Sequence, residues 1–175
     1  PNIAVRMDSG REGSGNYGLV GGEQYINVPT TLENADANEI KRFFLHAFCN
    51  AAGMFNEQQQ PDRDNYVKID FNNVKDNCKS AFDKIKSNYT TMGMFDMFSI
   101  TLASSKDFSK NGLNTITTKT GLGIAINYTL STQDKAFLNS HYLPYIARKD
   151  NYVELDDVYD QSGRRLTEEE RLQLQ

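Results

Sequence analysis

The sequence predicts one α+β domain with a small sheet, a long central helix and a shorter closing helix. The long helix begins near Asp36, because Asp36 and Glu39 have the spacing of a capping box. Apolar residues then recur three and four positions apart, which gives a single stripe for the core. That stripe consists of Ile40, Phe43, Phe44, Ala47, Phe48 and Ala51. Gly53 then ends the helix, since glycine adopts the left-handed conformation at little steric cost.

Further elements are expected on either side of this helix. Residues 1–9 can end a strand, and residues 18–28, GLVGGEQYINV, have the pattern of a strand approach, a glycine turn and a second strand. Residues 71–85 carry apolar side chains at helical spacing and predict one or two short helical turns. The closing helix is expected within residues 130–142, where Ser131 and Asp134 resemble a capping box.

Length and composition exclude several classes of protein. A chain of 175 residues is long enough for one domain with a real core. Its 38% hydrophobic and 11% aromatic content is typical of a globular fold rather than of disorder. The net charge of −4 and the pI near 5.2 give no electrostatic reason to expect nucleic acid or an anionic membrane. No apolar run approaches the ~20 residues of a membrane span, so we expect no transmembrane segment.

The two ends of the chain lead to separate expectations. No signal peptide is visible at Pro1, and the chain begins without methionine, so we expect a processed or trimmed start. We expect the domain to cover residues 1–146. Residues 147–175 are too polar to fold alone. We expect them to form a polar extension, either a solvated tail or an arm that packs on a neighbouring subunit.

One stretch resembles a known family. Residues 36–69, DANEIKRFFLHAFCNAAGMFNEQQQPDRDNYVKI, resemble the zinc helix of the astacin family of metzincin peptidases. Metzincins have HExxHxxGxxH on this helix, and astacins continue with a run similar to EQxRPDRDxYV. Gly53 fits the turn glycine. The residues that fit the following run are Glu57, Gln58, Pro61, Asp62, Arg63, Asp64, Tyr66 and Val67.

The chemical positions of that motif are altered in this chain. Counted back from the turn glycine, His46 falls on the first zinc histidine. Ala47 stands where the family has its general-base glutamate, and Asn50 and Asn56 stand where it has the second and third histidines. The resemblance therefore implies a zinc helix that has lost most of its ligands and its base.

A second and a third stretch show the same resemblance. Residues 95–119 are similar to the astacin pattern YDYxSIMHYxxxAFSxNGxxTIxPK, and residues 130–142 are similar to LSxxDxxxxNxLY. The fitting residues of the second stretch are Phe95, Asp96, Ser99, Ile100, Phe108, Ser109, Asn111, Gly112, Thr115, Ile116 and Lys119. Thr101 replaces the methionine under the zinc, Leu102 a histidine, and Ala103 the tyrosine that can ligate zinc.

The resemblance covers roughly residues 16–143 and implies a metzincin, zincin-like, two-lobed fold. In that fold a small twisted sheet and the long helix lie above a cleft, and an irregular lower lobe carries the closing helix. Only about 35 residues precede the long helix here, so the N-terminal lobe is expected to be shortened. A short sheet with open edges pairs readily with another strand. Assembly with another chain is one explanation, and a processing boundary is the other.

These substitutions predict a catalytically inactive, astacin-like pseudopeptidase that is a structural or protein-binding subunit of an extracellular assembly. A catalytic zinc needs about three good protein ligands and a water. One histidine and two carboxamides should bind zinc poorly, and no carboxylate stands at position 47 to take the proton from that water. We expect no catalytic residue, no metal and no cofactor. The vestigial positions are His46, Ala47, Asn50, Asn56, Thr101 and Ala103.

Two alternatives remain open. One is a zinc metalloendopeptidase with a rebuilt, atypical site, for which the available residues are His46, Cys49, Asp62 and Asp64. The other is a metal- or ligand-sensing binder that uses His46. We expect the partner to be a protein, in a homo- or hetero-oligomer, and not nucleic acid.

The remaining candidate residues concern the compartment. Cys49 and Cys78 are expected to be thiols, with a bridge between them as the alternative. Asn88 and Asn127 begin sequons that permit N-glycosylation. The resemblance to astacins is what implies an extracellular, secreted protein. His141 is expected to be a partly exposed residue at a helix end.

Overall fold

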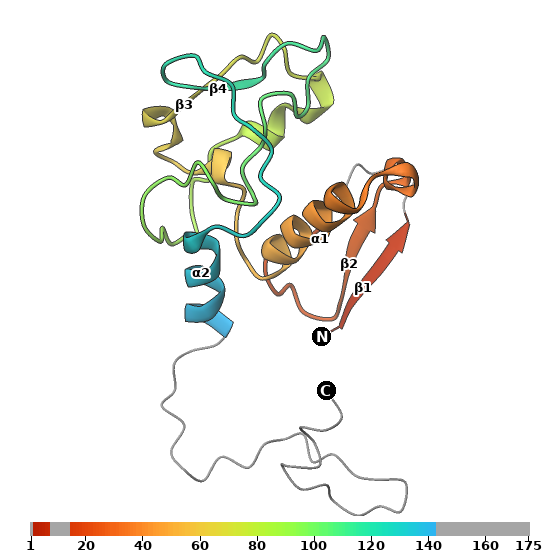
Figure 1. Cartoon of the computed structure of the whole chain (residues 1–175). Coiled ribbons are helices and arrows are strands. Elements are labelled where there is room, and N and C mark those ends of the chain that lie inside the picture. The colour runs from red at the N-terminus through yellow and green to blue at the C-terminus, as the bar shows by residue number, and fades with distance from the viewer. Residues whose placement is uncertain (1, 8–14, 143–175) are drawn as a thin grey trace, which may run out of the picture. The chain divides into compact units, whose positions relative to one another are not determined.

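The computed structural model describes residues 2–7 and 15–142, all of which belong to the compact unit Pro1–Leu143 (Figure 1). The predicted boundary between residues 146 and 147, and the predicted extension 147–175, lie outside the described residues. The strands are β1 (Asn2–Met7), β2 (Glu23–Val28), β3 (Val67–Ile69) and β4 (Ile116–Thr118). The α-helices are α1 (Ala37–Ala51) and α2 (Thr132–Tyr142). Short 3-10 helices are η1 (Thr30–Asn34), η2 (Glu57–Gln59), η3 (Arg63–Asn65) and η4 (Asp76–Phe82). The fold is α+β, as predicted.

Helix α1 begins and ends at the predicted signals. The side chain of Asp36 accepts hydrogen bonds from the backbone N–H of Asn38 at 2.8 Å and of Glu39 at 2.9 Å. The Glu39 carboxylate accepts the backbone N–H of Asp36 at 3.2 Å, which completes the capping box. Gly53, with φ of 98°, turns the chain after the helix. These signals fix where the site residues of α1 lie along the chain.

The N-terminal sheet differs in one respect from the expected glycine hairpin. Strand β2 forms at residues 23–28, but its partner is β1, which lies parallel to it with Asn2 opposite Glu23 and Met7 opposite Val28. Gly18, Gly21 and Gly22 have φ of 66°, 79° and 69°. Positive φ is incompatible with an extended strand, so residues 18–22 form a turn instead.

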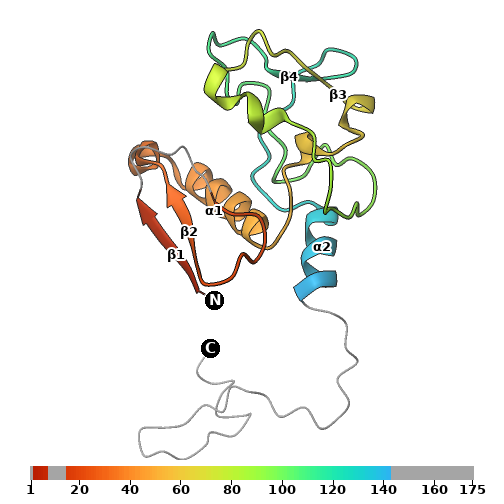
Figure 2. The same cartoon turned by 180° about the vertical axis from the view of Figure 1, so that it is seen from behind.

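The main core lies in the part of the chain that follows α1. Figure 2 shows this part, with β3 and β4, from behind. Strands β3 and β4 pair antiparallel, with Val67 opposite Thr118. The buried cluster consists of Val67, Val74, Phe82, Phe95, Leu102, Ala103, Ile116 and Ile124. Helix η4 confirms the helical turns expected within residues 71–85. Leu102 and Ala103, which hold altered motif positions, are thus part of this apolar core.

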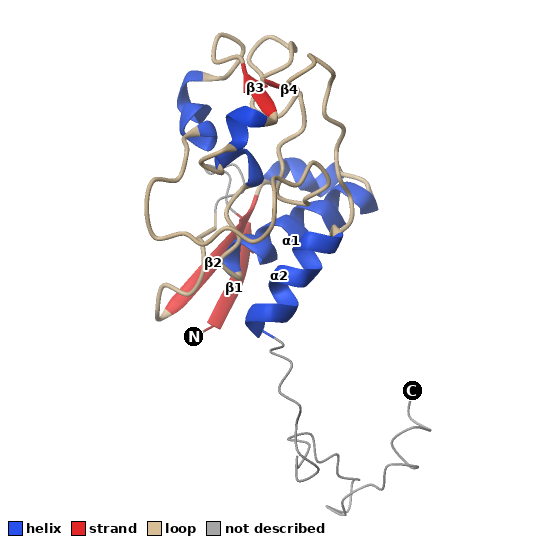
Figure 3. Cartoon of the chain, turned by 90° about the vertical axis from the view of Figure 1, so that its left-hand side faces the viewer, coloured by secondary structure: helices blue, strands red, loops and turns tan. Residues whose placement is uncertain are grey.

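Much of this region is loop (Figure 3). Buried polar side chains join these loops by hydrogen bonds. The Arg63 guanidinium is buried and donates to the carbonyls of Gln58 at 2.6 Å and Phe82 at 2.5 Å. Charged donors to backbone carbonyls are strong contacts in a dry environment. This arginine therefore joins η2 to η4.

Helix α2 begins at Thr132 and is capped by Ser131, as predicted. The Ser131 hydroxyl accepts the backbone N–H of Asp134, and the Asp134 carboxylate accepts the backbone N–H of Ser131, both at 2.9 Å. Asp134 also accepts the hydroxyl of Ser99 and the N–H of Ile100, both at 2.8 Å. The Asp134 carboxylate therefore caps α2 and also binds residues 95–119, the second stretch that resembles astacins, called the second motif below. His141 is exposed at the end of α2. None of the described helices is long and apolar enough to cross a bilayer.

Candidate functional site

Three of the predicted site positions meet at one oxygen atom. His46 and Asn50 lie one turn apart on α1, and the turn at Gly53 brings Asn56 back beside them. His46 Nε2 lies 2.8 Å from Asn56 Oδ1. Asn50 Nδ2 donates to the same oxygen at 3.1 Å and to the carbonyl of Met54 at 2.9 Å. The structure therefore brings the three positions together, as the motif predicts.

A residue that the sequence analysis missed completes this cluster. The Tyr17 hydroxyl accepts a hydrogen bond from Asn56 Nδ2 at 2.7 Å and donates to Gln59 Oε1 at 3.0 Å. Its ring packs on Phe55 with the centroids 4.9 Å apart. Burial raises the pKa of Tyr17, so its hydroxyl keeps the proton that it donates to Gln59.

The close approach of two glycines explains how Tyr17 reaches the site. A Cβ built on Gly18 would lie 3.6 Å from the Cα of Gly53. The N–H of Gly18 donates to the carbonyl of Asn50 at 2.9 Å, which ties this turn to α1. The glycine-rich stretch at residues 18–22 was the available signal in the sequence, but it did not single out the tyrosine beside it.

Burial determines the protonation state of the histidine. It lowers the pKa of His46, and the nearby Arg42 guanidinium acts in the same direction, while the bond to Asn56 acts against both. The ring is therefore neutral near pH 7. Because the carboxamide oxygen of Asn56 can only accept, the histidine proton lies on Nε2. The free lone pair of His46 is then on Nδ1.

The second motif lies against the residues that flank Asn56. Thr101 is buried, and its hydroxyl donates to the carbonyl of Phe55 at 3.3 Å. The backbone N–H of the buried Ala103 donates to Gln58 Oε1 at 3.0 Å. The structure thus places Thr101 and Ala103 beside the first motif, and neither carries a group that can ligate zinc strongly. Ala47 has only a methyl group on the helix between His46 and Asn50.

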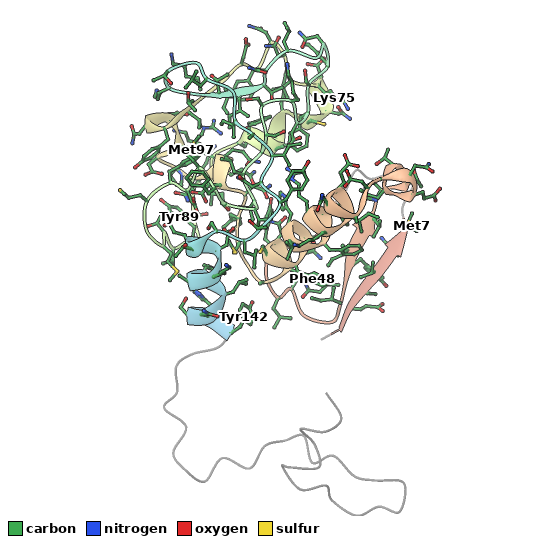
Figure 4. The ribbon with its side chains drawn as sticks, in the orientation of Figure 1. Met7, Phe48, Lys75, Tyr89, Met97 and Tyr142 are labelled. Atoms are coloured by element: carbon green, nitrogen blue, oxygen red, sulfur yellow. The ribbon has the colours of Figure 1, made fainter. Side chains whose placement is uncertain are left out.

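Three buried carboxyl groups form a second polar region next to this one. Glu57 Oε1 accepts the backbone N–H of Asp96 and the amide of Gln60, both at 2.6 Å. Burial raises the pKa of Glu57 to about 7, and the charges of Asp96 and Asp134 act in the same direction. A pocket of about 90 Å³ lies beside these groups, and its wall includes Tyr89, which is labelled in Figure 4.

The residues of a rebuilt site are not gathered around His46. Cys49 is buried, and burial raises the pKa of its thiol to about 12, so it is a poor metal ligand near pH 7. Asp64 pairs with Arg63 at 2.8 Å and with Lys84 at 2.5 Å, and Asp62 is exposed. Within residues 2–7 and 15–142, no group of three or more His, Cys, Asp or Glu side chains could hold a metal ion.

The donors at the motif positions do not fit a catalytic zinc. Such a zinc takes about three strong protein ligands and keeps one open position for water. Here the cluster offers one imidazole, whose Nε2 carries a proton, and two carboxamides. A carboxamide is a weak zinc donor, so only one residue of the three belongs to the usual ligand set.

This fold and this arrangement of motifs define an astacin-type, zincin-like domain, and comparison with known families agrees. The family model for astacin, which describes a family of peptidases, matches residues 9–143. The chain therefore belongs to the astacin family and is an astacin-family metalloprotease domain.

Two curated relatives are zinc metalloproteinases of Caenorhabditis elegans. The chain is 35% identical to nas-13 over 101 residues, which are 57% of this chain and 21% of that protein. It is 30% identical to nas-15 over 128 residues, which are 71% of this chain and 21% of that protein. The chain thus spans about a fifth of the length of these relatives.

Two solved structures share the fold. High choriolytic enzyme 1, a hatching enzyme zinc-protease from the medaka fish Oryzias latipes, aligns with a TM-score of 0.62 and 24% identity over 77% of this chain and 66% of its own. Myroilysin aligns with a TM-score of 0.54 and 20% identity over 80% of this chain and 72% of its own. At these identities the likeness shows the fold alone.

Proposed function

We propose that this astacin-family domain is catalytically inactive and is a structural or protein-binding subunit of an extracellular assembly. One observation carries the proposal. The oxygen of Asn56 accepts hydrogens from both His46 and Asn50, so the three motif positions bind one another through hydrogen bonds. Each group that would have to face a metal in an active relative faces a neighbouring side chain here.

The missing chemistry supports the same conclusion. A zinc-bound water becomes a hydroxide near neutral pH only when the metal is firmly held. A general base must then lie within hydrogen-bond reach of that water. Ala47 and Ala103 offer no proton-transfer group and no hydroxyl to stabilise a developing charge. Hydrolysis of a peptide by the usual zinc route would need all of these groups.

The framework that remains supports a role that depends on folding. The cap of α1, the turn at Gly53 and the Asp134 anchor of α2 are intact, and buried polar groups connect the loops. Random loss of function would damage such features as readily as the chemical positions. A protein that keeps its framework without its chemistry is suited to binding or assembly.

The extracellular location rests on the sequons and on the family. Asn88 is exposed in a loop with φ of 56°, a conformation that asparagine tolerates well. A glycan attached there would project into solvent. We include secretion and glycosylation at this position in the proposal.

Metal content and peptide cleavage test the proposal together. After incubation with zinc and desalting, the purified chain should hold well under one zinc ion and should not cleave a broad peptide library. The triple variant Ala47→Glu, Asn50→His, Asn56→His restores the family pattern and is the positive control for zinc binding. A stoichiometric zinc in the unmodified chain, with cleavage that a chelator abolishes, would show instead a metalloendopeptidase with a rebuilt site.

A further inference from the structure

The turn at residues 109–113 contains the single Asn-Gly pair of the sequence, Asn111 and Gly112. Both residues are exposed, and Gly112 has φ of 75°. A Cβ built on Gly112 would meet no heavy atom within 4 Å apart from its chain neighbours, so solvent reaches this peptide bond. Asparagine is a thermolabile residue, and a glycine that follows it has no side chain to shield its backbone nitrogen. The pair therefore has the composition and the exposure that spontaneous deamidation requires.

Hydrogen bonds hold both ends of the Asn111 carboxamide. Its Oδ1 accepts the backbone N–H of Leu113 at 3.1 Å, and the Ser109 hydroxyl also lies 3.3 Å from this oxygen. Its Nδ2 donates to Asn73 Oδ1 at 2.8 Å. Deamidation begins when the side-chain carbon Cγ turns onto the backbone nitrogen of Gly112. Because the carboxamide is bound at both ends, the contact with Asn73 should slow this movement.

The amide of Asn73 has a fixed orientation. Its Nδ2 donates to Asp70 Oδ2 at 3.2 Å and to the carbonyl of Asn114 at 2.8 Å. A flip of this amide would lose both bonds, so Oδ1 of Asn73 faces Asn111 as an acceptor. A carboxylate at position 111 has no hydrogen to donate to it. Deamidation would therefore replace a hydrogen bond by the repulsion of two oxygens.

The contact between Asn73 and Asn111 closes one end of a link between two segments. Val74 and Ser109 form an isolated antiparallel bridge. The backbone N–H of Lys110 donates to the carbonyl of Asn73 at 2.9 Å. The side-chain contact at residue 111 follows directly after this bond. Its loss would expose the last backbone bond of the link to fraying.

We propose that Asn111 is a site of spontaneous deamidation and that its contact with Asn73 sets the rate. The Gly112 nitrogen gives its proton to hydroxide and bonds to Cγ of Asn111, while the bond from Cγ to Nδ2 breaks and ammonia leaves. Water then opens the succinimide ring at either carbonyl, which gives aspartate or isoaspartate. The reaction consumes water alone. It involves none of the vestigial zinc positions, so it does not depend on the proposed loss of catalysis.

The product should loosen the link to residue 73. Isoaspartate adds a carbon atom to the main chain, which also disturbs the bond from Leu113 to the side chain at 111. Lys106 Nζ donates to the carbonyl of Gly112 at 2.5 Å. A new carboxylate that paired with Lys106 would still leave Asn73 without a donor, so this ion pair would not restore the link.

Peptide mass spectrometry of the aged full chain tests the site. After incubation in mildly alkaline buffer and digestion at mildly acidic pH, Asn111 should carry the mass increase of deamidation. The tryptic peptide of residues 111–119 also contains Asn114, which precedes threonine and is the internal control. Asn114 should remain unchanged over the same time. Equal deamidation of the two residues would overturn the assignment of the site.

A pair of neighbouring variants tests the control of the rate. Asn73→Ala frees Nδ2 of Asn111 and should raise the rate constant roughly fivefold, the factor expected when one ordinary hydrogen bond is lost. Asn72→Ala is the matched control, because Asn72 is exposed and its side chain makes no hydrogen bond within residues 2–7 and 15–142. It should keep the rate of the unmodified chain. Near-UV circular dichroism verifies that both variants are folded, and equal rates in folded variants would overturn the role of Asn73.

Hydrogen exchange gives a readout that does not depend on the Asn73 variant. Asn111→Asp reproduces one product and should speed exchange of the Lys110 amide severalfold, because that amide donates to the carbonyl of Asn73. Asn72→Asp adds the same charge one residue from Asn73 and should leave this exchange unchanged. Equal exchange in the two variants would overturn the predicted loosening. Each of these failures can occur while the chain binds no zinc and cleaves no peptide, so they are distinguishable from failure of the proposed function.

Discussion

Asn56 Oδ1 lies 2.8 Å from His46 Nε2 and accepts its proton in a hydrogen bond. In an astacin-type zinc helix these two positions would each present a lone pair to the same metal. Here a carboxamide has replaced one imidazole, and a hydrogen bond joins the two side chains directly. This bond lies between α1 and the loop that follows it, so it contributes to the stability of the site region.

The first prediction concerns the stability that Asn56 provides. Asn56→Ala leaves His46 Nε2 without its partner and removes one of two hydrogen bonds each from Asn50 Nδ2 and the Tyr17 hydroxyl. Unsatisfied, partly buried polar groups cost roughly 1–3 kcal/mol, so urea unfolding should show a free energy of unfolding lower by about 2 kcal/mol. Asn139→Ala, at an exposed position on α2, is the control and should change it by less than about 0.5 kcal/mol. Equal effects of the two variants would contradict the role of Asn56.

The second prediction concerns pH. The pKa of Glu57 is about 7 in the folded chain and lies near its ordinary value in the unfolded chain. Between about pH 4.5 and pH 7 the folded state therefore binds more protons than the unfolded state. The free energy of unfolding should fall across this window as pH rises, by roughly 3 kcal/mol, and should level off above it.

A glutamine at position 57 separates this effect from other titrations. Glu57→Gln keeps an oxygen for the N–H of Asp96 and removes the charge that lies near Asp96 and Asp134. Denaturant unfolding at several pH values should show a flatter profile for this variant. Glu33→Gln, in the exposed part of η1, should keep the profile of the unmodified chain. An unchanged slope in Glu57→Gln would show that other groups are responsible.

The third prediction concerns an ion pair between α1 and the second motif. Arg42 Nη2 lies 3.2 Å from Asp107 Oδ2, which also accepts the N–H of Ser104 at 2.9 Å. Asp107→Ala leaves a half-buried guanidinium without its carboxylate and should lower the free energy of unfolding by about 2 kcal/mol. Asp76→Ala breaks the exposed pair with Lys79, which is 2.7 Å long, and should lower the free energy of unfolding by much less, because exposed ion pairs contribute little to stability. Equal losses in denaturant titrations would contradict this ranking.

The fourth prediction separates the two sequons. Asn127 Nδ2 donates to the carbonyls of Met97 at 3.2 Å and Ser99 at 3.0 Å, so a glycan on this nitrogen would remove a contact that orders the loop. Asn88 is exposed, so a glycan on its side chain would project into solvent. In a eukaryotic secretory host, Thr90→Ala should abolish the glycosidase-sensitive mobility shift, and Thr129→Ala should leave it. The reverse result, confirmed by mass spectrometry of glycopeptides, would contradict the assignment to Asn88.

The sequence by itself determined the family, the fold class and the position of α1. These rest on local signals: a capping box at Asp36, an apolar stripe, the turn at Gly53, and motifs whose residues are close along the chain. The predicted site positions on and after the helix also meet in space, because helical spacing and one tight turn are enough to bring His46, Asn50 and Asn56 together.

Only the tertiary structure decided what those positions contact. The partner of β2 is β1 rather than residues 18–20, and Tyr17 reaches Asn56 because two glycines far apart in sequence approach each other. The raised pKa of Glu57 follows from its burial beside Asp96 and Asp134, which come from distant parts of the chain. Strand pairing, burial and long-range hydrogen bonds depend on which segments meet, and the periodicity of a single segment carries no information about its partner.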